Sequence, residues 1–112
     1  MALNVNDVQA TFFIDQEGTP RVNCQQPFFA LGDWIETDLG SCKDAVDEVL
    51  AEIDRVTEGQ QPSYEMTGNA YQIEVTPQEA QISCLWSEDE DAHCTITKET
   101  LIWALFQWKG LL

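Results

Sequence analysis

The residues that commonly carry out catalysis are few in this sequence of 112 amino acids. Its one histidine, His93, stands beside Cys94, and the nucleophilic dyads and triads of hydrolases need such a histidine. Neighbouring side chains of a strand point to opposite faces, so His93 and Cys94 are expected to diverge. The sequence contains no P-loop, no GxGxxG and no GxSxG motif. We therefore expect a protein that is not an enzyme.

Metal-binding patterns are equally weak. The four cysteines are Cys24, Cys42, Cys84 and Cys94. They form no CxxC pair, and their spacing fits no zinc site. His93, Cys94 and Cys84 supply three potential ligands without an evident fourth, and the acidic run 88–91 lacks the glycine and closing glutamate of an EF-hand. We expect no metal, no cofactor and reduced thiols, with Cys84–Cys94 as the one disulfide that a tight hairpin would allow.

Carboxylates are the abundant reactive group. Twenty Asp and Glu residues face five Lys and Arg, for a formal charge of −15. A hydrolase with an unrecognised carboxylate pair stays as an alternative, because so many acids always supply some pair. The electrostatic field of this net charge repels nucleic acid and anionic membranes and attracts basic proteins. Solubility needs only roughly 2–8 charges, so we expect a basic protein partner; acidity that serves solvation alone is the other interpretation.

The apolar pattern predicts an α+β fold in the order ββ–α–βββ–α, as one domain over residues 1–112. An antiparallel sheet of about five strands is expected, with two helices packed against it. Segments 11–14 and 21–24 are typical of a hairpin, and 28–35 of an extended stretch. Further strands are predicted at 64–67, 71–75, 80–86, with Ile82, Cys84 and Trp86 on one face, and 93–96.

Two helices are predicted. Ser41 is the expected N-cap of the first, which ends near Gly59 and has an acidic outer face. Thr97 caps the second, from 98 to about 110, which is apolar nearly all round. Trp103 points away from the main apolar stripe of this helix, and Phe106 lies on its flank. We expect these two aromatics to contact the first helix, another segment, a partner or a second copy of the chain.

Four short motifs follow one another along the chain. They are Asp-x-x-Gly-x-x-Arg at 15–21, Gly-Asp-Trp at 32–34, Gly-Asn-x-Tyr at 68–71 and Trp-Lys at 108–109. The sequence thereby resembles the YacL-like family of small bacterial proteins, and small acidic immunity proteins, grouped near it, that neutralise toxins. The resemblance implies an α+β fold and an immunity-like role, and it supplies no catalytic residue. The start of the sequence carries no secretion signal and no membrane-length apolar run, so we expect a cytoplasmic protein.

Clustered carboxylates beside a tryptophan suit the positive groove of a nuclease, which must hold phosphates. The first hypothesis is therefore an immunity protein that blocks the active groove of a basic nuclease toxin. The alternative is a dimerising structural or housekeeping domain that associates through Trp103 and Phe106. The predicted partner contacts are Asp33, Trp34, Glu36, Asp38, Asp44, Asp47, Glu48, Glu52, Glu88, Asp89, Glu90 and Asp91.

Overall fold

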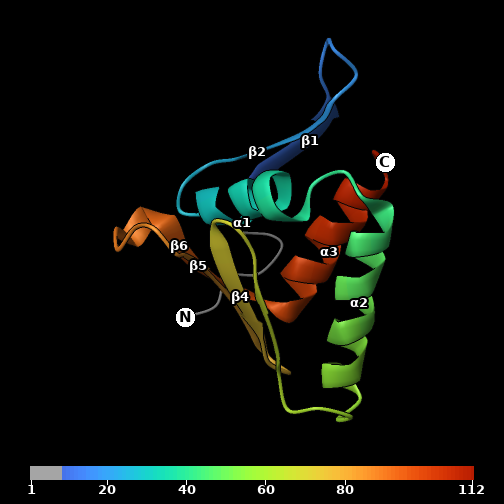
Figure 1. The fold of residues 1–112 in the computed structure, drawn as a ribbon, viewed down its shortest axis with the longest axis vertical. Coiled ribbons are helices and arrows are strands. Elements are labelled where there is room, and N and C mark those ends of the chain that lie inside the picture. Colours follow the sequence, from blue (N-terminus) through green and yellow to red (C-terminus); the bar gives the residue numbers. More distant parts are fainter. Residues whose placement is uncertain (1–8) are drawn as a thin grey trace.

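A computed structural model describes residues 9–112 and shows an α+β fold with strands in two separate sheets (Figure 1). Strands β1 (Ala10–Ile14) and β2 (Pro20–Cys24) form an antiparallel hairpin of their own. Four strands form the second sheet, in sequential antiparallel order: β3 (Tyr64–Thr67), β4 (Tyr71–Val75), β5 (Glu79–Cys84) and β6 (His93–Thr97). The α+β class is confirmed, whereas the single sheet of about five strands is wrong.

The segment after the first hairpin is helical, which corrects the prediction of an extended stretch at 28–35. Helix α1 (Phe29–Trp34) continues into the π-helix η1 (Ile35–Leu39). Aromatic and β-branched residues favour strands only through the surface they pack on. Here the buried residues Ala30, Leu31, Trp34 and Ile35 recur at helical spacing. Burial of that face outweighs the local preference, so three α-helices replace the two predicted.

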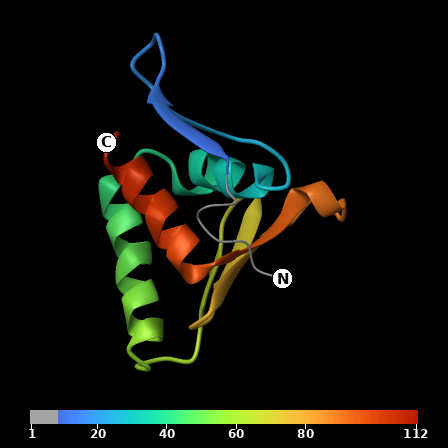
Figure 2. The same ribbon diagram turned by 180° about the vertical axis from the view of Figure 1, so that it is seen from behind.

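The two longer helices, α2 (Lys43–Thr57) and α3 (Lys98–Lys109), lie on the same side of the four-stranded sheet (Figure 1 and Figure 2). The N-cap of α2 is Cys42 rather than Ser41, and no side chain caps it. Gly59 follows the C-cap of α2 with a φ of 77°, the left-handed conformation that a glycine allows. Thr97 is confirmed as the N-cap of α3, since its Oγ1 accepts a hydrogen bond from Thr100 N at 3.2 Å.

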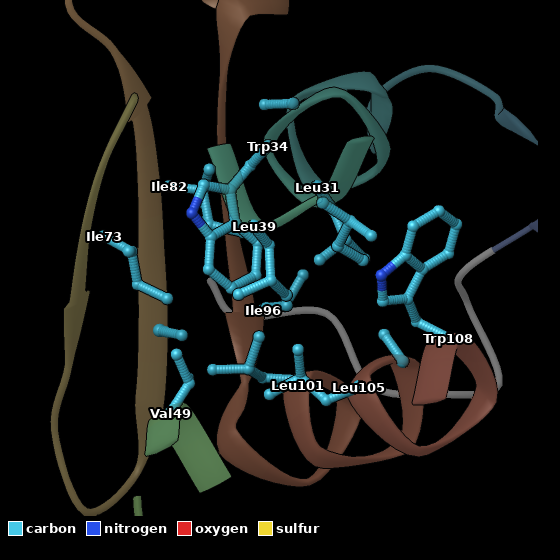
Figure 3. Packing of buried hydrophobic residues seen from close by; sticks show 14 of the residues in the cluster. Leu31, Trp34, Leu39, Val49, Ile73, Ile82, Ile96, Leu101, Leu105 and Trp108 are labelled. Atoms are coloured by element: carbon cyan, nitrogen blue, oxygen red, sulfur yellow. The ribbon is translucent and has the colours of Figure 1, made fainter. Parts of the chain in front are cut away.

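The core lies between the inner face of the sheet and the helices (Figure 3). Inward residues alternate along the strands, as in β4, where Tyr71, Ile73 and Val75 are buried. Trp108 of α3 donates from Nε1 to the carbonyl of Gly40 at 2.8 Å, which fixes the connection between η1 and α2. No helix within residues 9–112 has the length and hydropathy required to span a membrane.

Candidate protein-binding surface

Asp38, one of the predicted contacts, is committed to the fold. Helix η1 presents its carboxylate to the turn between β3 and β4, where Oδ1 accepts from Asn69 N and Ala70 N at 3.1 Å and Oδ2 from Tyr71 N at 2.8 Å. A Cβ on Gly68 would lie 2.5 Å from Oδ2, so only glycine admits the carboxylate. Asp38 thus holds a backbone turn together.

Asp33 and Glu36 have similar internal roles. Asp33 Oδ2 accepts from Tyr71 Oη at 2.7 Å, and burial together with this hydrogen bond raises the pKa of Tyr71. Glu36 accepts from Val22 N at 2.6 Å and pairs with Arg21, whose Nε lies 3.2 Å from Oε1. The Gly-Asp-Trp motif and the acids that follow it, Glu36 and Asp38, therefore contact both the first hairpin and the Gly-Asn-x-Tyr turn, which joins three of the motifs into one network.

Trp34 lies in the core. Its side chain has no solvent exposure, and it belongs to the same core cluster as Leu39 and Ile82 (Figure 3). A partner cannot reach this side chain in the folded protein. The prediction of Trp34 as a surface contact is wrong, because the segment that carries it is a helix with its apolar face turned inward.

Basic residues of the same chain partly neutralise the acidic face of α2. Asp47 Oδ1 lies 2.5 Å from Lys109 Nζ, and Glu52 pairs with Arg55 and accepts from Gln61 Nε2 at 3.1 Å. Asp44 and Glu48 are exposed along the same face. The structure places all four predicted residues on one helix, but the apolar residues of that helix face the core.

The loop that connects β5 and β6 carries Glu88, Asp89, Glu90 and Asp91, all exposed. Its backbone is ordered: Asp89 N donates to Ser87 Oγ at 3.2 Å, and the 3-10 helix η2 (Glu90–Ala92) follows. His93 Nε2 lies 3.0 Å from the carbonyl oxygen of Ser87 and closes the base of the loop. Among residues 9–112, no hydrogen bond or ion pair reaches the four loop carboxylates. Their charge is available to a partner.

Trp86 is the exposed tryptophan beside this loop, although the alternation of the strand predicted it on the same face as Ile82 and Cys84. Strand β5 ends at Cys84, opposite Tyr71, so the alternation of faces does not extend to Trp86. The indole is 79% exposed, and its Nε1 donates to the carbonyl of Asn69 at 2.9 Å. One sequence signal could have identified Trp86 as a surface residue, namely its position directly before Ser87 and the acidic run.

A groove lies between the loop and the start of α1. It has a volume of about 200 Å³ and is lined by Gln26, Phe29, Tyr71, Asp89, Asp91 and Ala92. Phe29 is 47% exposed there, and Leu85, next to Trp86, is 41% exposed. We refer to Phe29, Leu85, Trp86 and the loop 88–91 together as the tip surface. It combines apolar side chains with charges at one end of the sheet.

The predicted contact residues Trp103 and Phe106 behave differently from each other. The ring of Trp103 is partly buried and meets that of Phe12, from β1, edge-on at a centroid distance of 5.7 Å. The first hairpin supplies this contact, which makes it the other segment that was expected to cover Trp103. Phe106 is 56% exposed on α3. One aromatic alone makes a weak basis for a dimer.

All four cysteines are free thiols: Cys24 is buried, Cys84 and Cys94 are partly buried, and Cys42 is exposed. The strand register places Cys94 opposite Ile82 and Cys84 opposite Tyr71, so the two thiols are not directly paired. Burial raises the pKa of Cys24 to about 11 and that of Cys94 to about 12. Within the described part of the chain, no group of three His, Cys, Asp or Glu side chains is arranged to hold a metal ion.

The model of the uncharacterised protein family UPF0231 matches residues 10–100. The chain belongs to this family. The match agrees with the resemblance to YacL-like proteins. It includes the network around Asp38, Trp86 and the acidic loop of this UPF0231 protein. No curated protein and no solved structure matches the chain.

Proposed function

We propose that this UPF0231 protein is a non-catalytic binding protein that recognises a basic protein through the tip surface. The observation that carries the proposal is Trp86, which is 79% exposed beside four carboxylates that have no hydrogen-bond or ion-pair partner within residues 9–112. Leu85 and Trp86 place two large exposed apolar side chains next to each other in the sequence, and tryptophan is enriched among the residues that dominate binding energy.

The two components of the tip surface have separate tasks. The loop carboxylates increase the rate of encounter with a cationic partner and form charge-assisted hydrogen bonds with its Arg and Lys side chains. Trp86 supplies apolar area in a fixed orientation, because its Nε1 is bonded to Asn69 and Asn69 N to Asp38. A prearranged anchor loses little conformational entropy on binding.

The finer part of the proposal is an immunity role in the cytoplasm. A nuclease toxin presents a positive groove because its substrate is a polyanion. A net charge of −15 complements such a groove, and an ordered acidic loop beside an aromatic anchor is suited to occupy it. The protein would then act by stoichiometric blockade, without chemistry of its own.

Affinity capture tests the proposal. Tagged protein, its Trp86→Ala variant and its Phe106→Ala variant are used to capture proteins from an extract of the native host, at low and at physiological salt. Both variants remove one exposed aromatic, but only the first changes the tip surface. We expect a basic protein that is lost with Trp86→Ala and kept with Phe106→Ala. Equal capture by all three forms would refute the tip surface as the binding site.

Dimerisation through Trp103 and Phe106 has less support. Phe12 covers part of Trp103, which leaves Phe106 as the exposed aromatic of this pair. We expect a monomer in sedimentation equilibrium at micromolar concentration, and Phe106→Glu to leave the sedimentation behaviour unchanged.

A further inference from the structure

The groove of the tip surface has walls of two chemical kinds. Phe29 and Tyr71 supply aromatic rings, and Asp89 and Asp91 supply carboxylates. Tyr71 is buried and its hydroxyl donates to Asp33, so Phe29 supplies the exposed aromatic ring of the groove. The groove has a volume of about 200 Å³, which is enough for one amino-acid side chain. Its occupant therefore has to satisfy an aromatic face and negative charges at once.

We propose that this groove binds a single arginine side chain of the partner protein. The guanidinium group is planar, stacks on aromatic rings and donates hydrogen bonds to two carboxylates at the same time. Charge complementarity supports a cation, because the groove carries two carboxylates and none of the five basic residues of the chain lines it. The proposal rests on the proposed function and assigns the residue type that the partner inserts.

Arginine fits these walls better than lysine does. An ammonium group is a compact, strongly hydrated charge that cannot stack, whereas a guanidinium is more weakly hydrated and matches carboxylates in plane. A nucleotide or other anionic ligand is repelled by Asp89, Asp91 and their neighbours in the loop. One wall of the groove is a hydrogen-bonded turn, since Ala92 N donates to the carbonyl of Asp89 at 3.0 Å.

The test uses the full chain, labelled with ¹⁵N, and three short probes. These are acetyl-Gly-Arg-Gly-amide, its lysine counterpart and its uncharged citrulline counterpart, titrated at low ionic strength. We expect amide shifts centred on Phe29, Asp91 and Ala92 with the arginine peptide, binding about threefold weaker with lysine, and no saturable shifts with citrulline. Equal binding of the arginine and lysine peptides would contradict a guanidinium site.

Matched variants separate the groove from general acidity. Asp89→Asn with Asp91→Asn removes two charges that line the groove, and Glu88→Gln with Glu90→Gln removes two charges of the same loop that do not. We expect the first pair to weaken the arginine peptide about fivefold and the second less than twofold. Equal losses for both pairs would mean that the peptide senses only the charge of the loop, and would overturn the proposal.

A second pair tests the aromatic wall. Phe29→Leu is expected to weaken the arginine peptide about threefold, whereas Phe13→Leu, at an exposed aromatic outside the groove, is expected to have no effect. Both residues are exposed, so both variants are expected to fold. Arginine binding that survives Phe29→Leu unchanged would contradict stacking in the groove.

The peptide test and the capture test fail independently. A captured basic partner that depends on Trp86, combined with no binding of the arginine peptide, would overturn the arginine site and leave the proposed function standing. Saturable arginine binding in the groove, combined with a partner that ignores the tip surface, would support the arginine site and overturn the proposed function.

Discussion

The carboxylates of α1–η1 and those of the loop 88–91 carry the same charge but differ in their contacts with the rest of the chain. Asp33, Glu36 and Asp38 accept hydrogen bonds from tyrosine, arginine or backbone donors of segments distant in sequence. The carboxylates of the loop accept none within residues 9–112. The first group stabilises the fold, whereas the second remains solvated. Recognition is therefore expected where charge has no internal partner, and a count of charges alone does not locate it.

The acidic face of α2 is intermediate between these groups. It lies on the opposite side of the molecule from the loop (Figure 1 and Figure 2). Two of its predicted contact residues, Asp47 and Glu52, have a basic partner on the chain, and Asp44 and Glu48 are exposed. No large exposed apolar side chain of α2 accompanies them. This face therefore offers charge to a partner but no large apolar side chain for it to bury.

The largest expected difference is between the two tryptophans of these regions. Trp34→Ala removes a fully buried indole from the core, and we expect a loss of about 3–5 kcal/mol in the free energy of unfolding. Trp86→Ala is expected to cost less than about 1 kcal/mol, because the indole is mostly exposed and keeps one hydrogen bond. Urea unfolding measures both. A larger loss for Trp86 than for Trp34 would contradict the assignment of core and surface.

The next effect concerns Asp38. Asp38→Ala leaves the backbone donors of Asn69, Ala70 and Tyr71 without their acceptor, and we expect a loss of about 3 kcal/mol in the free energy of unfolding. Asp89→Ala, which removes the same charge from the loop, is expected to change it by no more than about 0.5 kcal/mol. Equal effects in urea unfolding would erase the distinction between internal and external carboxylates.

Much of the fold follows from sequence patterns, and the failures have physical causes. The hairpin, the helix at 43–57 and the cap Thr97 were predictable because periodicity and turn residues are local properties. Helix α1 was not, because Phe28–Ile35 has strand-like composition and becomes helical only by packing Ala30, Leu31 and Trp34 into the core. The separation of the first hairpin from the sheet is likewise a matter of tertiary packing.

The candidate site was predicted in part. The acidic loop was identified from its composition, and Trp34 was named as the aromatic contact beside the helix acids, whereas the exposed tryptophan is Trp86. Trp86 was overlooked because the end of a strand is hard to locate, and β5 stops two residues before it. The roles of Asp33, Glu36 and Asp38 depend on contacts 14 to 38 residues away, which no local pattern encodes.

Alkaline pH is expected to lower the free energy of unfolding through the buried thiols and not through the loop carboxylates. Burial raises the pKa of Cys24 from 9.0 to about 11 and that of Cys94 to about 12. Between pH 9 and the raised pKa of each thiol, the unfolded chain loses the thiol proton while the folded protein keeps it. Stability is therefore full below pH 9 and falls above it, by up to about 1.4 kcal/mol per pH unit for each thiol. Urea unfolding between pH 8 and 11 measures the slope, and Cys24→Ala should make it shallower. An unchanged slope in that variant would show that Cys24 does not contribute.

The smallest effect concerns self-repulsion in the loop. Glu88→Gln with Glu90→Gln is expected to raise the free energy of unfolding by up to about 0.5 kcal/mol at low salt, because it lowers a net charge of −15. Screening should reduce the gain at physiological ionic strength. Thermal melts at two salt concentrations measure it. A clear destabilisation would mean that these carboxylates have internal partners after all.

The most direct test of the central claim is the association rate of the captured basic partner with two charge-reversed proteins. One carries Glu88→Lys, Glu90→Lys and Trp86→Ala at the tip surface, and the other carries Asp44→Lys and Glu48→Lys on α2. Stopped-flow fluorescence at low salt gives the rates, after cooperative unfolding confirms that both variants fold. We predict association at least about tenfold slower for the tip variant and within about threefold of the parent for the α2 variant. A partner that binds the tip variant at the parental rate, or is slowed only by the α2 variant, would contradict the account.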